Sequence, residues 1–150
     1  MKSNPYSKFA LMLAVSFVVM YSVMFLNVDS VDHIYLSLNR LYMTLLMVSP
    51  MGLFMLIFMG DMYKDKKINT AIYITSISVF VGVFALLRNQ TFVGDVQYMK
   101  AMIPHHSSAI LTSQNASIED PEVRQLADDI IKAQEKEIAQ MKAMLDRLQK

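Results

Sequence analysis

Three long apolar runs without charge are the feature that most constrains how this chain can fold. They cover residues 9–26, 41–59 and 68–87, and none contains a charged side chain. A helix needs about 17–25 residues to cross a hydrocarbon core about 30 Å thick, so each run is long enough. Three such runs are too many for the buried core of a 150-residue globular protein. We therefore predict an all-α chain that begins with three transmembrane helices in a lipid bilayer.

The placement of lysine and arginine predicts the orientation of these helices. Lys2 and Lys8 precede the first run, and three lysines lie between the second and third runs. The loop between the first and second runs carries two aspartates and one arginine. Because positively charged loops stay on the cytoplasmic side, the N-terminus is expected in the cytoplasm. An odd number of spans then places the C-terminal region in the periplasm or outside the cell.

Composition narrows the chemistry that is open to the chain. The net charge of +1 provides no basic face for nucleic acid. Cysteine is absent, so methionine, with 14 residues, and histidine, with three, are the soft or borderline ligands for a transition metal. No Ser-His-Asp set, glycine-rich phosphate loop or Glu-x-x-His motif occurs, so we do not expect an enzyme.

The second apolar run carries methionine at every fourth position, at 43, 47, 51, 55 and 59. Side chains four residues apart share one helix face, with a drift of about 40° per step. One interpretation is a chain of thioethers that conducts Cu(I). Three spans with Met-x-x-x-Met in the second resemble the eukaryotic copper-transporter family, although that family's Met-rich N-terminus and Gly-x-x-x-Gly third span are missing. The other interpretation is methionine that packs helices or faces lipid, and both stay open.

The C-terminal third reads as a water-soluble helical pair. Gly94 and Asp95 predict a helix start with Asp95 as N-cap, and the helix should run to about residue 113 with a kink at Pro104. Asp120 followed by Pro121 predicts the start of a second helix that ends near residue 149. We therefore expect a membrane domain over residues 1–90 and an antiparallel helical hairpin domain over residues 95–150.

Both predicted helices of the hairpin have an apolar seam at steps of three and four residues. Three polar residues interrupt the seams, and because buried polar groups need partners, we expect them to meet one another, a water molecule or a metal. The first seam comprises Val96, Met99, Ile103, His106 and Ile110, and the second comprises Val123, Ala127, Ile130, Gln134, Glu137, Met141, Met144 and Leu148.

Histidine and methionine gather around these seams and form a candidate metal site. Imidazole and thioether together suit copper, and Cu(I) favours more thioether. His105 and His106 lie 100° apart on the helix, so they cannot both point toward the hairpin partner. A structural alternative stays open, in which His106 bonds to Glu137 or Gln134 and methionine only fills the core. The candidate ligands are Met99, Met102, His105, His106, Glu137 and Met141.

One segment is similar to the signature of domain-of-unknown-function family 305 (DUF 305). It reads Met102-Ile103-Pro104-His105-His106 and then Ala109-Ile110, and the stretch from Pro121 to Met141 fits as well. The resemblance covers residues 95–145. It implies a ferritin-like helical bundle, an extracytoplasmic location and, as in CopM-like members, copper held by Met102, His105, His106 and Met141. Family members usually have methionine in place of Thr112 and an aromatic residue in place of Met144, so Met144 is a weaker candidate that would restore one thioether.

A single helical pair is half of a four-helix bundle. About 55 residues bury little surface alone, so we expect homodimerisation through residues 95–150. The leading hypothesis is a membrane-anchored, extracytoplasmic copper-binding protein for metal tolerance or trafficking. The alternatives are a structural module that dimerises without metal and a copper-conducting protein that uses the methionine stripe of the second helix.

Overall fold

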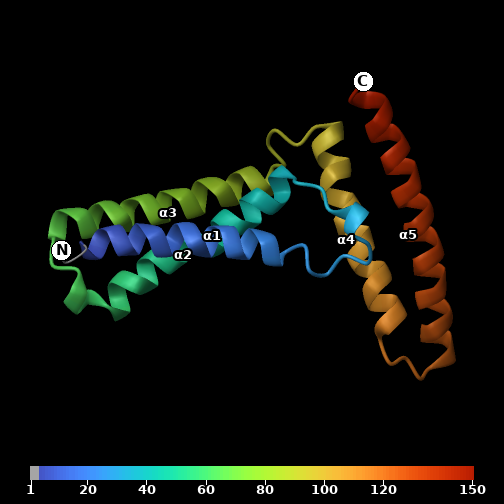
Figure 1. Ribbon diagram of the computed structural model, residues 1–150, viewed down its shortest axis with the longest axis horizontal. Coiled ribbons are helices and arrows are strands. Elements are labelled where there is room, and N and C mark those ends of the chain that lie inside the picture. Colours follow the sequence, from blue (N-terminus) through green and yellow to red (C-terminus); the bar gives the residue numbers. More distant parts are fainter. Residues whose placement is uncertain (1–3) are drawn as a thin grey trace. The chain divides into compact units, whose positions relative to one another are not determined.

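The computed structural model of the protein describes residues 4–150, and this part of the chain is all-α without strands (Figure 1). Three apolar helices are followed by a helical hairpin, which confirms the predicted fold class. The helices are α1 (Pro5–Val23), α2 (Leu38–Phe58), α3 (Lys66–Arg88), α4 (Asp95–Asn115) and α5 (Pro121–Leu148), with short 3-10 helices η1 (Val31–His33) and η2 (Gly60–Met62).

The chain divides into two compact units. The membrane unit consists of Met1–Val23 and Asn39–Thr91, and the hairpin unit consists of Met24–Leu38 and Phe92–Lys150. The segment 24–38 connects α1 to α2 in sequence but belongs to the hairpin unit. The predicted domain boundaries place this segment in a membrane domain of residues 1–90, whereas in the structure the hairpin unit consists of two separate stretches of the chain.

The helices α1, α2 and α3 are each long and apolar enough to cross a membrane, with 19, 21 and 23 residues. They begin two to four residues before the predicted runs of 9–26, 41–59 and 68–87. The early start of α1 has a local cause. Proline is well tolerated in the first turn of a helix, where Pro5 lies, and the Asn4 side chain accepts a hydrogen bond from the Tyr6 backbone N–H at 3.0 Å. Length and hydropathy thus identify the spans, and capping sets their first residues.

Polar and aromatic contacts join α1 to α3 at one end of the membrane unit. Asp65 is the N-cap of α3, and its carboxylate accepts from the backbone N–H groups of residues 67 and 68. The Tyr6 hydroxyl donates to Asn69 Oδ1 at 2.9 Å and accepts from the Asp65 N–H at 3.0 Å. Beside these bonds, Phe9 and Tyr63 pack edge to face with ring centroids 5.6 Å apart. This end of the unit is therefore held by both hydrogen bonds and packing.

Gly52 marks a close approach between α2 and α3. A Cβ atom at this position would lie 2.9 Å from Ser76 Oγ and 3.5 Å from Phe9 Cζ. Without a strong hydrophobic drive between helices in lipid, close packing at small residues is a main source of association. Gly82 in α3 is the matched contrast, because a Cβ atom there meets nothing within 4 Å.

The helices α4 and α5 lie side by side and form the hairpin (Figure 1). Its core consists of Met99, Ile103, Ile110, Ile138 and Leu145, and their burial confirms the predicted seam of α4. The predicted seam of α5 was wrong in its C-terminal half. Ile138 and Leu145 are buried there, one position beyond Glu137 and Met144, since the branched aliphatic side chains face α4 and a shift of one residue rotates the helix face by 100°.

The predicted N-cap is correct for α5 and wrong for α4. Asp120 caps α5 by accepting from the backbone N–H groups of residues 122 and 123, as predicted. The N-cap of α4 is Gly94, not Asp95 as predicted, and Asp95 is the first residue of the helix. An acidic side chain in the first turn still complements the helix dipole. Pro104 is buried inside a helix that continues through it to Asn115.

A larger side chain at the close approach is expected to destabilise the membrane unit. Gly52→Leu overfills the contact with Ser76 and Phe9, and we expect a loss of about 1–3 kcal/mol in the free energy of unfolding. Unfolding in detergent micelles, followed by circular dichroism, measures this loss. Gly82→Leu adds the same side chain in open space and should leave stability nearly unchanged. Equal losses in both variants would contradict the close packing of α2 on α3.

Candidate functional site

The candidate site centres on His106, whose two ring nitrogens both have partners. Nδ1 lies 2.9 Å from the backbone carbonyl oxygen of Met102, and Nε2 lies 2.7 Å from Glu137 Oε2. A carbonyl oxygen only accepts, so Nδ1 must carry the hydrogen. Such a bond orients the ring and leaves Nε2 as the nitrogen that can bind a metal or contact the carboxylate. The pair joins α4 to α5 across 31 positions of sequence.

The contact between His106 and Glu137 also fixes the register of the hairpin. Moving one turn along each antiparallel helix reaches Met102 on α4 and Met141 on α5, so these two residues lie at one level. Both are partly buried, and Met141 packs against the hairpin core. One imidazole, one carboxylate and two methionines are therefore grouped within about one helical turn.

The other predicted ligands lie apart from this group. Met99 is only 5% exposed and belongs to the hydrophobic core. His105 is exposed, and its ring lies nearly perpendicular to that of His106 with centroids 6.2 Å apart. Met144 is also exposed, at 46%. The structure thus pairs His106 with Glu137 and places Met102 and Met141 one turn away on the two helices, while Met99 lies in the core and His105 and Met144 are exposed.

The chemistry of the donor set limits which metal could fit. Among residues 4–150, no three His, Cys, Asp or Glu side chains gather where they could hold a metal ion. The hairpin therefore brings one imidazole and one carboxylate together, and the thioethers of Met102 and Met141 are the soft donors one turn away from them. Thioether ligands favour copper, above all Cu(I), over zinc, iron or magnesium.

The opposite side of the hairpin is covered by the segment 24–38. The Ser107 hydroxyl, fully buried, accepts from the Asp29 backbone N–H at 2.7 Å and lies 2.9 Å from His33 Nδ1. Lys142 on α5 forms an ion pair with Asp32. Sequence reasoning missed this group, because contacts between residues 74 to 110 positions apart leave no periodic signal in the sequence.

Charges in this contact shift two pKa values. Hydrogen bonds from Lys142 and Ser30 lower the pKa of Asp32 from 3.8 to about 2. Burial, with help from the Lys142 charge, lowers the pKa of His33. His33 is therefore neutral near pH 7 and acts through its hydrogen bond to Ser107.

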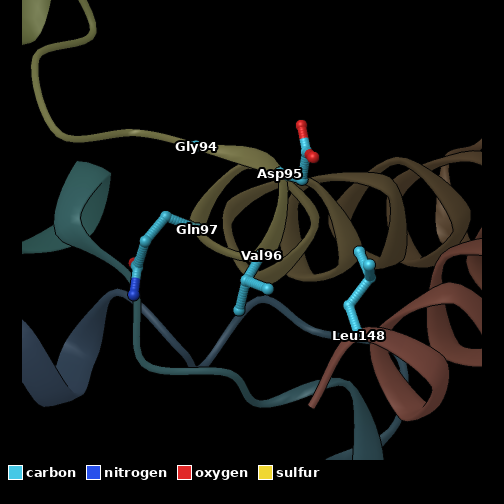
Figure 2. Close-up of a pocket in the computed structure, with 5 residues that line it drawn as sticks. All are labelled: Gly94, Asp95, Val96, Gln97 and Leu148. Carbon is cyan, nitrogen blue, oxygen red and sulfur yellow. The ribbon is translucent and has the colours of Figure 1, made fainter. Parts of the chain in front are cut away.

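A cavity of about 330 Å³ lies at the end of the hairpin, where α4 begins and α5 ends (Figure 2). Val96 and Leu148 extend into the space between the two helices, while the Asp95 carboxylate points away from them (Figure 2). The Gln97 side chain is already engaged, because its Oε1 accepts from the Leu38 backbone N–H at 3.0 Å. The walls of the cavity are mainly apolar, and they present few polar groups that could select a ligand.

The methionine stripe of α2 spreads over different environments within the membrane unit. Met43 and Met47 are exposed on the helix surface. Met55 instead packs against the cluster of Phe9, Leu56 and Tyr63. Three of the stripe's methionines, Met43, Met47 and Met59, are therefore exposed, and Met55 fills a helix contact.

Fold and site together define an all-α protein with three helices able to cross a membrane and a hairpin that carries a paired histidine and glutamate. The sequence profile described as "Domain of unknown function (DUF305)" matches residues 87–150. "Uncharacterized protein L153" of Acanthamoeba polyphaga mimivirus is 42% identical over 144 residues, which cover 93% of this chain and 92% of that protein. The chain belongs to the same family as this relative, and its residues 87–150 carry the DUF305 domain. No solved structure matches the chain significantly.

Acid is expected to loosen the segment 24–38 from the hairpin. The lowered pKa of Asp32 means that its ionised form contributes stability above the unfolded pKa of about 4, and the contribution is lost as the pH falls toward about 2. Carboxyl carbon NMR shifts and amide hydrogen exchange of residues 24–38 measure this transition. Asp32→Asn should weaken protection at neutral pH and remove the acid transition. An unchanged transition in that variant would show that another group titrates.

Proposed function

We propose that this protein is a membrane-anchored copper-binding protein whose hairpin holds the metal outside the cytoplasm, for metal tolerance or trafficking. The observation that carries the proposal is the orientation of His106. Its Nδ1–H is held by the Met102 carbonyl, and Nε2 faces the partner helix. In metal-binding histidines one nitrogen is commonly fixed by an acceptor while the other ligates the metal, and in this protein copper would replace Glu137 as the partner of Nε2.

The residues around His106 support copper over harder metals. Met102 and Met141 lie one turn away at the same level, on the two helices that the histidine and glutamate already join. The ligand set assigned to copper is His106 Nε2 with the thioethers of Met102 and Met141, and Glu137 is the carboxylate beside it. His105 is exposed and lies outside this set, although the family resemblance includes it.

The charge of the loops supports the location. Lys64, Lys66 and Lys67 lie between α2 and α3, and the segment 24–38 carries Asp29 and Asp32 without lysine or arginine. By the positive-inside rule, the loop between α2 and α3 is cytoplasmic and the hairpin lies on the other side of the membrane. That side is where a binding protein could intercept external copper.

A structural role without metal is the second candidate function, and a specific observation favours it. Both nitrogens of His106 already have hydrogen-bond partners in the protein, and only 12% of its side chain is exposed. A satisfied pair of this kind can specify the register of two helices by itself. Metal binding and its absence are therefore distinguished by ligand substitutions that preserve the fold.

Loss of the imidazole is expected to weaken copper binding. In the full chain, purified in detergent with a reductant, His106→Ala should lower the affinity for Cu(I) by about 10- to 100-fold, since it removes the central ligand. Competition with a chromophoric Cu(I) chelator measures the affinity. His105→Ala is the matched control on the adjacent residue and should bind as the unmodified protein does. Equal binding by all three proteins would refute the copper site.

Substitution of the two methionines distinguishes a copper site from a His106–Glu137 pair that is only structural. Met102→Leu combined with Met141→Leu keeps side-chain volume, so the change in stability should stay below about 1.5 kcal/mol per site. Copper affinity should fall in this variant and stay unchanged in Met99→Leu, which alters the core alone. If the double substitution leaves Cu(I) affinity intact, the two methionines are not ligands and only fill the core.

The orientation has its own test, which the absence of cysteine makes simple. A single cysteine replacing the exposed Glu119 should react with a membrane-impermeant maleimide in intact cells. A single cysteine replacing Lys67 should react only after the membrane is permeabilised. The reverse pattern would place the hairpin in the cytoplasm.

A further inference from the structure

The two broad faces of the hairpin differ in what covers them. Ser107 and Lys142 point to the face that the segment 24–38 occupies. At 100° per residue, Met102 and His106 lie on the other side of α4, away from Ser107. On this second face the described chain places no covering segment, and the His106–Glu137 pair lies along it. We call this uncovered side the open face.

The open face of α5 consists of one stripe at alternating steps of three and four residues. Leu126 and Met144 are 60% and 46% exposed, and an exposed row of apolar side chains is typical of an interaction surface. The glutamate of the site lies in the middle of the stripe. Its members are Val123, Leu126, Ile130, Ala133, Glu137, Gln140 and Met144.

This stripe is complementary to itself when two copies run in opposite directions. With a twofold axis level with residue 135, Leu126 faces the second copy's Met144, and Ile130 faces the second copy's Gln140. Ala133 then faces the second copy's Glu137, so a small side chain gives room to the polar one. An interface related by a twofold axis requires this kind of self-complementarity.

The open face of α4 gives the same axis independently. The contact between His106 and Glu137 sets the levels of the two antiparallel helices, so position 135 on α5 is level with about position 108 on α4. On the open face, Ala109 of the second copy is the residue nearest the level opposite His106, and Ser113 of the second copy is the residue nearest the level opposite Met102. Each polar member of the pair therefore meets an alanine, one from α4 and one from α5.

Charge along α5 favours the same antiparallel arrangement. Residues 119–129 contain five acidic side chains and one basic one, a net charge of −4. Residues 142–150 contain three basic side chains and one acidic one, a net charge of +2, although Lys142 is already paired with Asp32. An axis at residue 135 places the acidic end of each helix against the basic end of the other. A parallel arrangement would bring like charges together.

We propose that two copies of this chain pair through their open faces into an antiparallel four-helix bundle, and that the two His106–Glu137 pairs form one metal site at the twofold axis. The two Glu137 residues lie about 6 Å apart along the helix direction, slightly more than one helical turn. The second copy adds its own His106 imidazole to the ligands proposed above, the His106 imidazole and the methionine thioethers, with the two Glu137 carboxylates beside them, and one hairpin does not contain this set. The shared site rests on the proposed copper function, whereas the pairing of the hairpins does not.

Cysteine cross-linking in membranes tests the pairing directly. Leu126→Cys with Met144→Cys should form covalent dimers under diamide oxidation at least tenfold faster than either single variant. Within one helix the two positions are about 27 Å apart, so a disulfide between them must join two chains. The chain has no cysteine of its own to interfere. Dimer formation by Leu126→Cys alone would indicate a parallel pairing and overturn the proposal, as would a monomer in all variants.

A matched control keeps the two cysteines 18 residues apart but places them on a different face of α5. Gln125→Cys with Ala143→Cys has the same 18-residue spacing, is exposed, and is rotated about 100° from the stripe. It should cross-link no faster than the single variants. Equal rates for both double variants would mean random collision in the membrane and would overturn the specific interface. Circular dichroism confirms that each variant keeps its helices.

Copper stoichiometry then separates the two proposals. One copper ion per cross-linked pair supports the shared site, and one per chain that is independent of cross-linking overturns it. A cross-linked dimer that binds no copper refutes the copper function and leaves the pairing intact. Copper binding without any specific cross-link supports the copper function and overturns the pairing of the hairpins.

Discussion

Apolar packing between α4 and α5 sets the register on which the candidate site depends. Ile103, Ile110, Ile138 and Leu145 are each at most 3% exposed, and removing such side chains costs about 2–5 kcal/mol each. Sliding one helix by a single residue would rotate these side chains out of the core by 100°. The core therefore fixes which polar residues face each other, and the meeting of His106 with Glu137 is a consequence of that register.

Two requirements act on the same polar pair, and they explain why it lies at the edge of the core. A histidine and a carboxylate in the centre would pay a large desolvation cost, while a fully exposed pair would contribute little. With 12% of the His106 side chain and 51% of the Glu137 side chain exposed, the pair is oriented by packing and still reachable from solvent. A metal site needs both properties, since the ligands must be held in place and the ion must be able to enter.

Sequence alone predicted what depends on local pattern and composition. The three apolar runs, the N-cap at Asp120 and the seam of α4 were all visible as length, capping chemistry or period. The seam of α5 was misplaced because Glu137 and Ile138 both continue an acceptable period, and only the partner helix decides between them. The contacts of Ser107 with the segment 24–38 join residues far apart in sequence, so no periodicity could have indicated them.

The segment 24–38 links the membrane anchor to the chemistry of the hairpin. By covering one broad face of α4 and α5, it leaves the other face as the surface along which a second hairpin can pack. A free hairpin would have two such faces and could add copies on both, which leads to open assemblies. One covered face would limit the proposed assembly to a closed pair. The mimivirus relative aligns with 93% of the chain, so the similarity covers the apolar helices, the segment 24–38 and the hairpin alike.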